Sequence, residues 1–212
     1  MYGSHMRAEY LNKSGEKIEV ELRPPLDENR EAKKFVAWFN DNRVRQYLSM
    51  SCGLSESEEI DWIRGQNQKK DDLVWFAYIS EDPVGSIGLH RIDRENQHAE
   101  LGISVGNRDY WGKGIATVME ILVLEYAFEN VVAGGLHKVW ARVFAGNGAS
   151  QRIIEDKLGF RSIGIKKEEL WRHGRWYDEW SGEMLSSDWR KKKGDAIKNA
   201  GITELDLYPG CE

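Results

Sequence analysis

Hydrophobic residues recur along the chain with two periods, one typical of strands and the other typical of helices. A period of two over residues 18–22 predicts a first strand, which ends at Pro24 and Pro25. Further segments rich in branched and aromatic residues predict six more strands. These segments cover residues 73–79, 84–92, 99–105, 138–145, 160–170 and 176–185.

Apolar positions three and four residues apart predict four helices. The clearest repeat begins at Ile115 and continues to Tyr126. Ser55 and Glu58 have the spacing of a capping box, which predicts the start of a second helix. The remaining two helices are expected over residues 27–40 and 147–158.

The order of these elements predicts an α+β fold in which helices cover both faces of one mixed sheet. Residues 99–145 form a strand–helix–strand unit, so its two strands should be parallel. We expect one domain over residues 7–189 and interpret residues 1–6 as the remnant of a purification tag. Residues 190–212 begin with a basic run and contain few periodic hydrophobic residues, which predicts an exposed appendage.

Composition and charge narrow the classes of function. The 35 acidic and 30 Lys or Arg residues give a net charge of −5, which disfavours nucleic-acid partners because phosphates need a basic face. No apolar run approaches the ~20 residues of a membrane helix, and the N-terminus is polar, so we expect no membrane partner and no signal peptide. Cys52 and Cys211 lie far apart, so we expect a cytoplasmic protein without a metal site.

The strand over residues 99–105 separates its side chains onto two faces. One face carries Ala99, Leu101, Ile103 and Val105, and the other carries Glu100, Gly102 and Ser104. The single charged side chain of this strand is therefore expected opposite the apolar face.

Residues 111–117, with the sequence Trp-Gly-Lys-Gly-Ile-Ala-Thr, combine a glycine turn with the start of the longest helix. Gly112 and Gly114 allow the backbone to approach a ligand closely. The first turn of a helix offers free amide hydrogens and a positive dipole end, which together suit a pyrophosphate. An ordinary glycine turn before a helix is the alternative.

Two known phosphate-binding patterns do not match this segment. In a P-loop the lysine follows the second glycine and precedes Ser or Thr, whereas Gly114 follows Lys113, and Gly106 is one residue too far from Gly112. A dinucleotide fingerprint requires a third glycine at the position of Thr117.

The same segment resembles the acetyl-coenzyme A pyrophosphate loop of the GNAT N-acetyltransferase superfamily. That pattern has Arg or Gln, two residues of any kind, Gly, any residue, and Gly or Ala, and residues 111–116 match it except at the first position. Trp111 replaces the polar residue there, while the backbone amides remain. The Trp-Gly-Lys-Gly sequence is similar to the branch that contains the ribosomal-protein N-terminal acetyltransferases RimJ and RimL.

Other segments match the same superfamily in the expected order. Residues 99–103, 126–128 and 137–143 resemble its fourth strand, the end of its third helix and its fifth strand. Asn147, Ser150, Gly159 and Phe160 resemble its N-x-x-S and G-F signature, although this chain is one residue longer there than the usual pattern. The resemblance covers residues 18–189.

The resemblance implies a GNAT fold, with a twisted, mostly antiparallel sheet of about seven strands. Its parallel fourth and fifth strands splay apart, and the pantetheine arm of acetyl-CoA, the expected cosubstrate, lies in the gap. The backbone of Ile103, Ser104 and Val105 is expected to pair with that arm, and Asn147 to bind it by its side-chain amide. The expected pyrophosphate site consists of Trp111, Gly112, Lys113, Gly114, Ile115, Ala116 and Thr117.

Acetyl transfer to an amine requires a base for the amine proton, donors for the oxyanion and a hydrogen bond or proton for the thiolate. The resemblance implies that Glu100 is the base, with a solvated or salt-bridged strand glutamate as the alternative. Many relatives use a tyrosine to protonate the thiolate, but Ile154 stands at that position. Ser150 is therefore the candidate, as in the RimL-like branch, and a hydroxyl that caps the helix is the alternative.

The acceptor amine is left open by the sequence. An N-acetyltransferase that uses a protein N-terminal α-amine by direct attack in a ternary complex is our first expectation. The acidic net charge mildly favours a small amine such as a polyamine or an aminoglycoside, and a non-catalytic acyl-CoA-binding module is a third hypothesis. Trp38, Tyr47 and Trp75 are candidates for the acceptor cleft, with core packing as the alternative. The oligomeric state is also left open, and a homodimer is one possibility because dimers are common among relatives.

Overall fold

The computed structural model describes residues 1–48, 53–172 and 174–207, and the elements below lie in this part of the chain. The strands are β1 (Met6–Leu11), β2 (Lys17–Arg23), β3 (Leu73–Ile79), β4 (Asp82–Asp93), β5 (His98–Val105), β6 (Lys138–Phe144), β7 (Arg161–Arg172), β8 (Arg175–Leu185) and β9 (Ile202–Asp206). The helices are α1 (Glu28–Asn40), α2 (Asn42–Arg45), α3 (Glu56–Gly65), α4 (Ile115–Asn130), α5 (Gly148–Arg152) and α6 (Ser186–Asn199). A π-helix over Ile153–Lys157 continues α5 directly, and 3-10 turns follow α3 at Gln66–Gln68 and β5 at Arg108–Tyr110.

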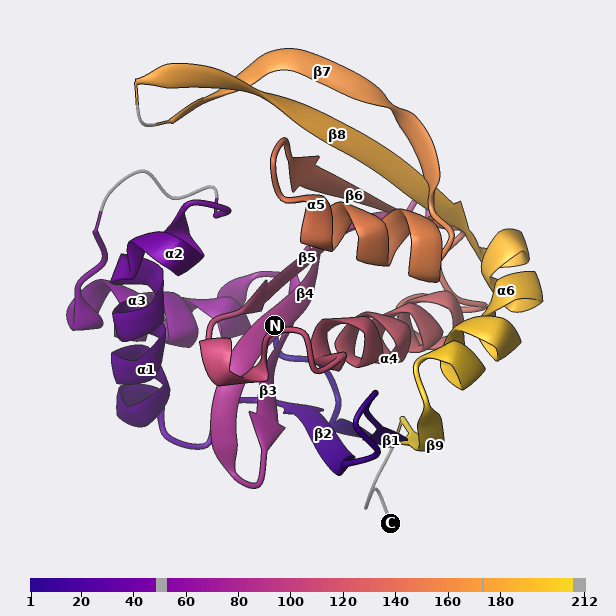
Figure 1. Ribbon diagram of the computed structural model, residues 1–212, viewed down its shortest axis with the longest axis horizontal. Coiled ribbons are helices and arrows are strands. Elements are labelled where there is room, and N and C mark those ends of the chain that lie inside the picture. The colour runs from indigo at the N-terminus through magenta and orange to yellow at the C-terminus, as the bar shows by residue number, and fades with distance from the viewer. Residues whose placement is uncertain (49–52, 173, 208–212) are drawn as a thin grey trace.

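The strands form a single sheet in the order β7-β8-β6-β5-β4-β3-β2-β1-β9. β5 and β6 pair in parallel, and the other neighbouring strands in the described residues pair antiparallel. Helices α1 to α3 lie on one side of the strands and α4 to α6 on the other (Figure 1). The structure confirms the predicted mixed α+β fold and its parallel pair, in a sheet that is larger than expected.

The larger core lies between α4 and the sheet. Val118, Met119 and Leu122 of α4 are fully buried in the same cluster as Leu89 of β4 and Leu101 of β5. The outer side of α4 is covered by α6 and by the π-helix. A helix that is hydrophobic on nearly all sides is therefore enclosed on nearly all sides, and its N-terminus is held rigidly against the end of β5.

A smaller core lies on the opposite face, where α1 and α3 pack. Phe35 of α1 and Ile63 of α3 meet Phe76 and Tyr78 of β3, while the neighbouring Trp75 belongs to the larger core. β3 is therefore buried on both faces, in agreement with its continuous run of apolar residues. The capping box predicted at the start of α3 is present.

One strand begins inside the segment that we interpreted as a tag remnant. β1 alternates buried and partly exposed residues, with Met6, Ala8 and Tyr10 fully buried, and it lies between β2 and β9. Met6 is therefore part of the folded domain. The origin of residues 1–6 as a tag stays a prediction.

The described part of residues 190–212 is not an exposed appendage, contrary to our expectation. α6 buries Trp189 and Ala196, and β9 pairs antiparallel with β1 at the edge of the sheet. Only these two positions of α6 are buried, so hydrophobic residues repeat too rarely in its sequence to predict a helix. Arg190, Lys191 and Lys192 of the basic run are exposed, whereas Lys193 pairs with Glu125 of α4.

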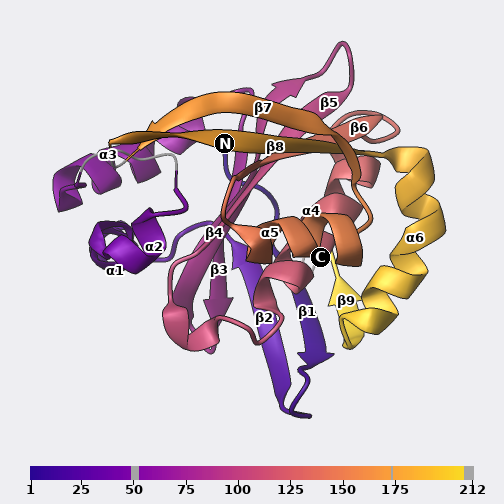
Figure 2. The same ribbon diagram turned by 45° about the horizontal axis from the view of Figure 1, so that its top comes forward.

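β7 and β8 form a long hairpin that extends past α5 toward the side of α1 to α3 (Figures 1 and 2). Trp171 and Trp176, close to its tip, are about half exposed and pack edge to face with ring centroids 5.2 Å apart. The tip of the hairpin therefore projects beyond the strands that lie next to it in the sheet (Figures 1 and 2). Separately, none of the helices described is both long and apolar enough to cross a membrane.

Candidate active site

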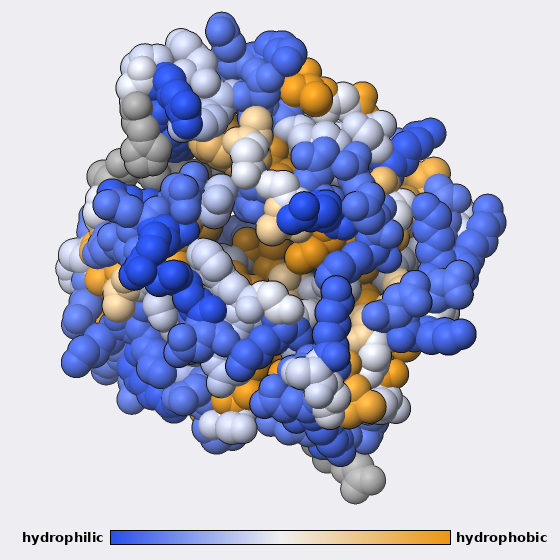
Figure 3. All heavy atoms as spheres, in the orientation of Figure 1, coloured by the Kyte–Doolittle hydropathy of each residue, from blue (hydrophilic) through white to orange (hydrophobic). Residues whose placement is uncertain are grey.

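A cavity of ≈590 Å³ opens where β5 ends, where α4 begins and where α5 faces both. Figure 3 shows that the face seen in Figure 1 is hollowed near its middle, with hydrophobic atoms at the bottom of the hollow. The lining comes from five places in the sequence: the β1–β2 loop, the end of α2, the end of β5, the turn before α4 with its first turns, and α5 with the π-helix. Most of the predicted cofactor-binding residues belong to this lining, namely Ile103, Ser104, Val105, Trp111, Gly112, Gly114, Ile115, Ala116, Thr117 and Asn147.

The cavity exists because β5 and β6 separate. Their last pair in register is Leu101 with Ala141, and the following residues of β5 have no partner in β6. Residues 99–101 are buried, whereas residues 102–105 are half exposed along the gap. The edge of β5 that faces the gap can therefore pair with an extended ligand, as the resemblance implied.

The start of α4 provides a site for anionic groups. Gly114 is the N-cap in the left-handed region (φ 93°), and no side chain caps the helix. The amides of residues 115–117 consequently have no acceptor within the helix and face the cavity. Gly112 also has a positive φ of 76°, so both glycines are required by backbone conformation.

Trp111 has a structural role that explains the departure from the family pattern. Its indole N–H donates to the Val105 carbonyl at 2.7 Å, and this bond joins the end of β5 to the turn before α4. The Lys113 carbonyl accepts from the Tyr10 hydroxyl at 3.1 Å. Lys113 itself is the one predicted member of the pyrophosphate site that does not line the cavity.

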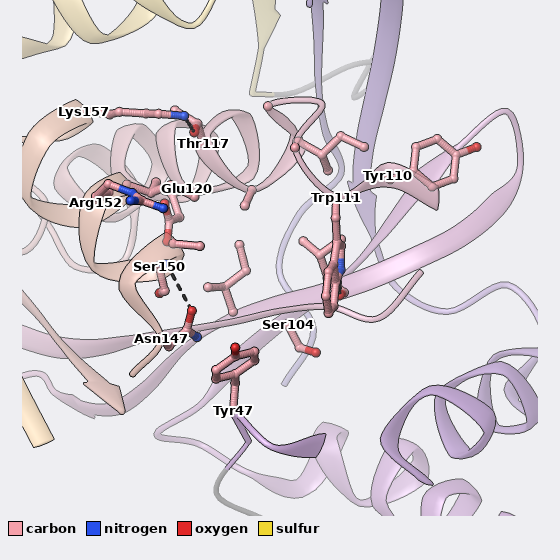
Figure 4. A pocket seen from close by; sticks show the side chains of 18 of the residues that line it. Tyr47, Ser104, Tyr110, Trp111, Thr117, Glu120, Asn147, Ser150, Arg152 and Lys157 are labelled. Carbon is pink, nitrogen blue, oxygen red and sulfur yellow. Dashed lines mark hydrogen bonds between the residues drawn. The ribbon is translucent and has the colours of Figure 1, made fainter. Parts of the chain in front are cut away.

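The cavity is also lined by three cationic side chains that the sequence reasoning did not single out. They are Lys13 from the β1–β2 loop, Arg152 from α5 and Lys157 from the π-helix. Lys157 donates to the Thr117 hydroxyl at 3.2 Å, so it is held beside the first turn of α4 (Figure 4). These charges complement a ligand with several phosphate groups, and only the tertiary fold brings them together.

The π-helix accounts for the extra residue between Asn147 and Phe160. A π turn absorbs one inserted residue without breaking the helix, and here the Leu158 amide donates to the Ile153 carbonyl, five residues earlier. Ile154, at the position of the family's tyrosine, is buried in the core, whereas Ile153 lines the cavity.

Asn147 and Ser150 lie next to each other at the start of α5. The Asn147 side-chain oxygen accepts from the Ser150 amide at 3.2 Å and so caps the helix (Figure 4). The cap is supplied by the asparagine side chain, so the Ser150 hydroxyl is not needed for it. Both residues line the cavity, and the catalytic role of Ser150 stays a prediction.

Glu100 does not line the cavity, although it lies on the predicted face of β5. One carboxylate oxygen accepts from Arg91 of β4 and the other from Arg142 of β6, both at 2.6 Å. Arg142 also contacts Glu179 of β8 at 3.3 Å. The ion-paired alternative for Glu100 is therefore the observed arrangement, and its role as a base stays a prediction.

His90 lies directly across from Glu100 in the β4–β5 register. Its ring covers two glycines: a methyl group added at Gly88 or at Gly102 would lie 2.8 or 3.3 Å from Nε2. Asp72 approaches the other ring nitrogen, Nδ1, at 3.4 Å. Sequence reasoning considered this histidine only as a metal ligand, because no local spacing links it to Asp72.

The three aromatic candidates for the acceptor cleft differ in position. Tyr47 is partly exposed and lines the cavity. Trp75 is fully buried and belongs to the larger core. Trp38 packs on Phe35 and against Gly106, outside the cavity lining. Core packing is therefore confirmed for Trp75, and Tyr47 remains the candidate.

Metal ligands and thiols complete the predicted chemistry. In residues 1–48, 53–172 and 174–207, no group of three or more His, Cys, Asp or Glu side chains is arranged to hold a metal ion. Cys52 and Cys211 lie outside the described residues.

Comparison with known proteins agrees with this geometry. Residues 19–161 match the family model of the acetyltransferase (GNAT) domain. The putative ribosomal N-acetyltransferase YdaF of Bacillus subtilis is 26% identical over 187 residues, which cover 85% of this chain and 98% of that protein.

Two solved structures share the fold. The structure of Mycobacterium smegmatis RimJ in complex with CoA-disulfide superposes with a TM-score of 0.76 at 19% identity, over 95% of this chain and 96% of that one. The structure of Vibrio cholerae spermidine N-acetyltransferase in complex with CoA and spermine superposes with a TM-score of 0.72 at 20% identity, over 81% and 98%. With the family model over more than half of its length and with β5 and β6 splayed beside the uncapped start of α4, this chain belongs to the GNAT family and is an acetyl-CoA-dependent N-acetyltransferase.

Proposed function

We propose that this enzyme acetylates the α-amine of a protein N-terminus in the cytoplasm, by direct attack within a ternary complex. The observation that carries the proposal is the chemistry of the acceptor end of the cavity. Val44, Tyr47 and Leu48 line it from the end of α2. None of these three side chains is acidic, so this end suits the first side chains of a peptide better than a polycation.

The character of the amine supports the same conclusion. A peptide α-amine has a pKa of roughly 7.7–8.0, whereas a primary alkyl amine of the lysine type has one of about 10.4. A substantial fraction of α-amines is therefore neutral at cellular pH, and only the neutral amine attacks. Since both oxygens of Glu100 are occupied by arginines, this site favours the acceptor that is easier to deprotonate.

His90 and Ser150 are the side chains that we assign to proton transfer. His90 lies outside the cavity lining, as Glu100 does, and we assign it to accept the proton of the attacking nitrogen through Nε2, with Asp72 orienting its ring. Ser150 donates a hydrogen bond to the departing thiolate from the cavity side. Glu100 holds Arg91 and Arg142 in place on the acceptor face and acts through them.

The relatives support a peptide acceptor by name and by coverage. YdaF is described as a ribosomal N-acetyltransferase, and the RimJ structure covers nearly all of this chain. Spermidine N-acetyltransferase covers less of it. A small-amine acceptor is the alternative that the experiment must separate.

The test is the release of free CoA thiol from acetyl-CoA with three acceptors: peptides that begin with Ser or Ala, the same peptides with blocked N-termini, and spermidine. We expect turnover with the free peptides only. Ser150→Ala should lower that turnover while it leaves acetyl-CoA binding unchanged, which shows that the signal comes from this site. Turnover with spermidine and none with the free peptides would overturn the proposal.

A further inference from the structure

Glu120 is a buried carboxylic acid inside the cavity of an enzyme whose cosubstrate is an anion. It lies on α4, one turn beyond the free amides of residues 115–117, and it lines the cavity although only 1% of its surface is exposed. Figure 4 shows its side chain among the lining residues, on the α4 side of the cavity. An ionised carboxylate at this place would repel phosphate groups.

No side chain in the described residues satisfies this carboxyl. Its Oε2 is buried without a hydrogen-bond partner. The charged groups that line the same cavity are Lys13 on the β1–β2 loop, Arg152 on α5, and Asp156 and Lys157 on the π-helix. The charge of Lys157 acts on Glu120, but its ammonium group donates its hydrogen bond to the Thr117 hydroxyl instead. A buried polar atom without a partner calls for an explanation. Glu59 Oε1 also lacks a partner, but only Glu120 lies in the cavity, where a ligand can supply one.

We propose that Glu120 binds acetyl-CoA as a neutral acid and donates a hydrogen bond from its carboxyl group to an acceptor oxygen of the cosubstrate. Glu120 is then a binding residue that is specific for the protonated state, and each acetyl-CoA bound at alkaline pH takes up one proton. This inference concerns the cosubstrate and does not depend on the identity of the acceptor amine.

The electrostatic surroundings favour the neutral form. Burial raises the pKa of Glu120 to about 8, and the charge of Lys157 opposes that rise. Only the protonated carboxyl can donate, so affinity is full below the pKa of the free enzyme and decreases as the pH rises above it. With a pKa of about 8, about nine in ten carboxyls are protonated at pH 7 and about one in ten at pH 9, so the Kd should rise about tenfold between these values.

The test is isothermal titration of acetyl-CoA at pH 7 and pH 9, repeated in buffers with different ionisation enthalpies to count the protons taken up. For the natural sequence we expect a Kd that is about tenfold higher at pH 9, with proton uptake approaching one per site. Glu120→Gln keeps a donor and removes the titration, so its Kd should be the same at both pH values, without proton uptake. Glu120→Ala removes the donor and should bind more weakly at pH 7.

Glu59 provides a matched control. It is also a buried glutamate, burial raises its pKa to about 7, and it lies on α3 away from the cavity. Glu59→Gln should keep the pH dependence of the natural sequence. The proposal is overturned if the natural sequence binds acetyl-CoA equally at both pH values, or if Glu120→Gln retains its proton uptake; the first of these needs no variant to fold.

Discussion

At the scale of single residues, His90 and Glu100 differ in which of their polar atoms already have partners. Glu100 and His90 face each other across β4 and β5, yet only Glu100 has both of its acceptor atoms occupied, by Arg91 and Arg142. Because each carboxylate oxygen already accepts a hydrogen bond from a guanidinium group, neither oxygen is left free for an incoming amine. An imidazole that contacts one carboxylate keeps its second nitrogen available.

These two residues can be separated by substitution. His90→Gln should lower kcat/KM with a peptide by about 10²-fold, the lower range for loss of a general base. Glu100→Gln should change the rate less, because it disturbs only the arginines. Steady-state kinetics of both variants with the same peptide measures the two losses. If Glu100→Gln lowers kcat/KM more than His90→Gln does, Glu100 is the base.

At the scale of elements, the ends of helices position the site. α4 begins at a glycine with positive φ and leaves its first amides free, while the π-helix shifts the residues that follow α5 so that Lys157 reaches α4. α4 ends at Asn130, and the turn that follows it contains Gly134 and Gly135, both with positive φ. The second glycine also lies against the helix: an added methyl group would be 1.8 Å from the Phe128 carbonyl oxygen.

The two adjacent glycines form a matched pair for a stability experiment. Gly134→Ala meets no neighbouring atom, so it should lower the free energy of unfolding only by the cost of a left-handed alanine, about 1 kcal/mol. Gly135→Ala adds a collision with backbone and should cost roughly 3 kcal/mol or more. Urea denaturation measures both values. Equal losses would show that the end of α4 adjusts freely.

At the scale of the whole molecule, the chain closes on itself through its C-terminal segment. β9 lies beside β1, and α6 packs on α4 through Trp189, whose indole donates to the buried Glu125. Lys193 adds an ion pair to the same glutamate at 2.9 Å. The helix that presents the anion site at its first turn is therefore supported along its length by the last helix of the fold.

A pair of tryptophans tests this support. Trp189→Ala removes a side chain that is 1% exposed and should lower the free energy of unfolding by about 3–5 kcal/mol. Trp176→Ala, at the hairpin tip and 53% exposed, should change it by no more than about 0.5 kcal/mol. Thermal and chemical unfolding of both variants provide the comparison. A small loss in Trp189→Ala would mean that α6 is an independent appendage after all.

The sequence by itself determined the local elements and, through the family resemblance, predicted where the cosubstrate site lies. The alternation in residues 99–105, the helical repeat after Ile115, and the glycine turn at residues 111–117 depend on neighbours within a few positions. Such signals are visible in a single chain because the backbone period and the first turn of a helix are local properties. Asn147 and Ser150 were predicted differently, from their resemblance to the N-x-x-S signature of the family.

Only the tertiary structure decided how the charged side chains are paired. Arg142 reaches Glu100 from 42 residues away, and Glu120 becomes buried only when α4 packs against the π-helix and the sheet. The same holds for β1 and β9, which are weak patterns until each supplies the other with hydrogen bonds. Which side chains pair and which become buried depends on which distant segments meet. A charged group loses its water only after they have met, and this desolvation sets both the free-energy cost of burying the charge and the strength of its ion pairs.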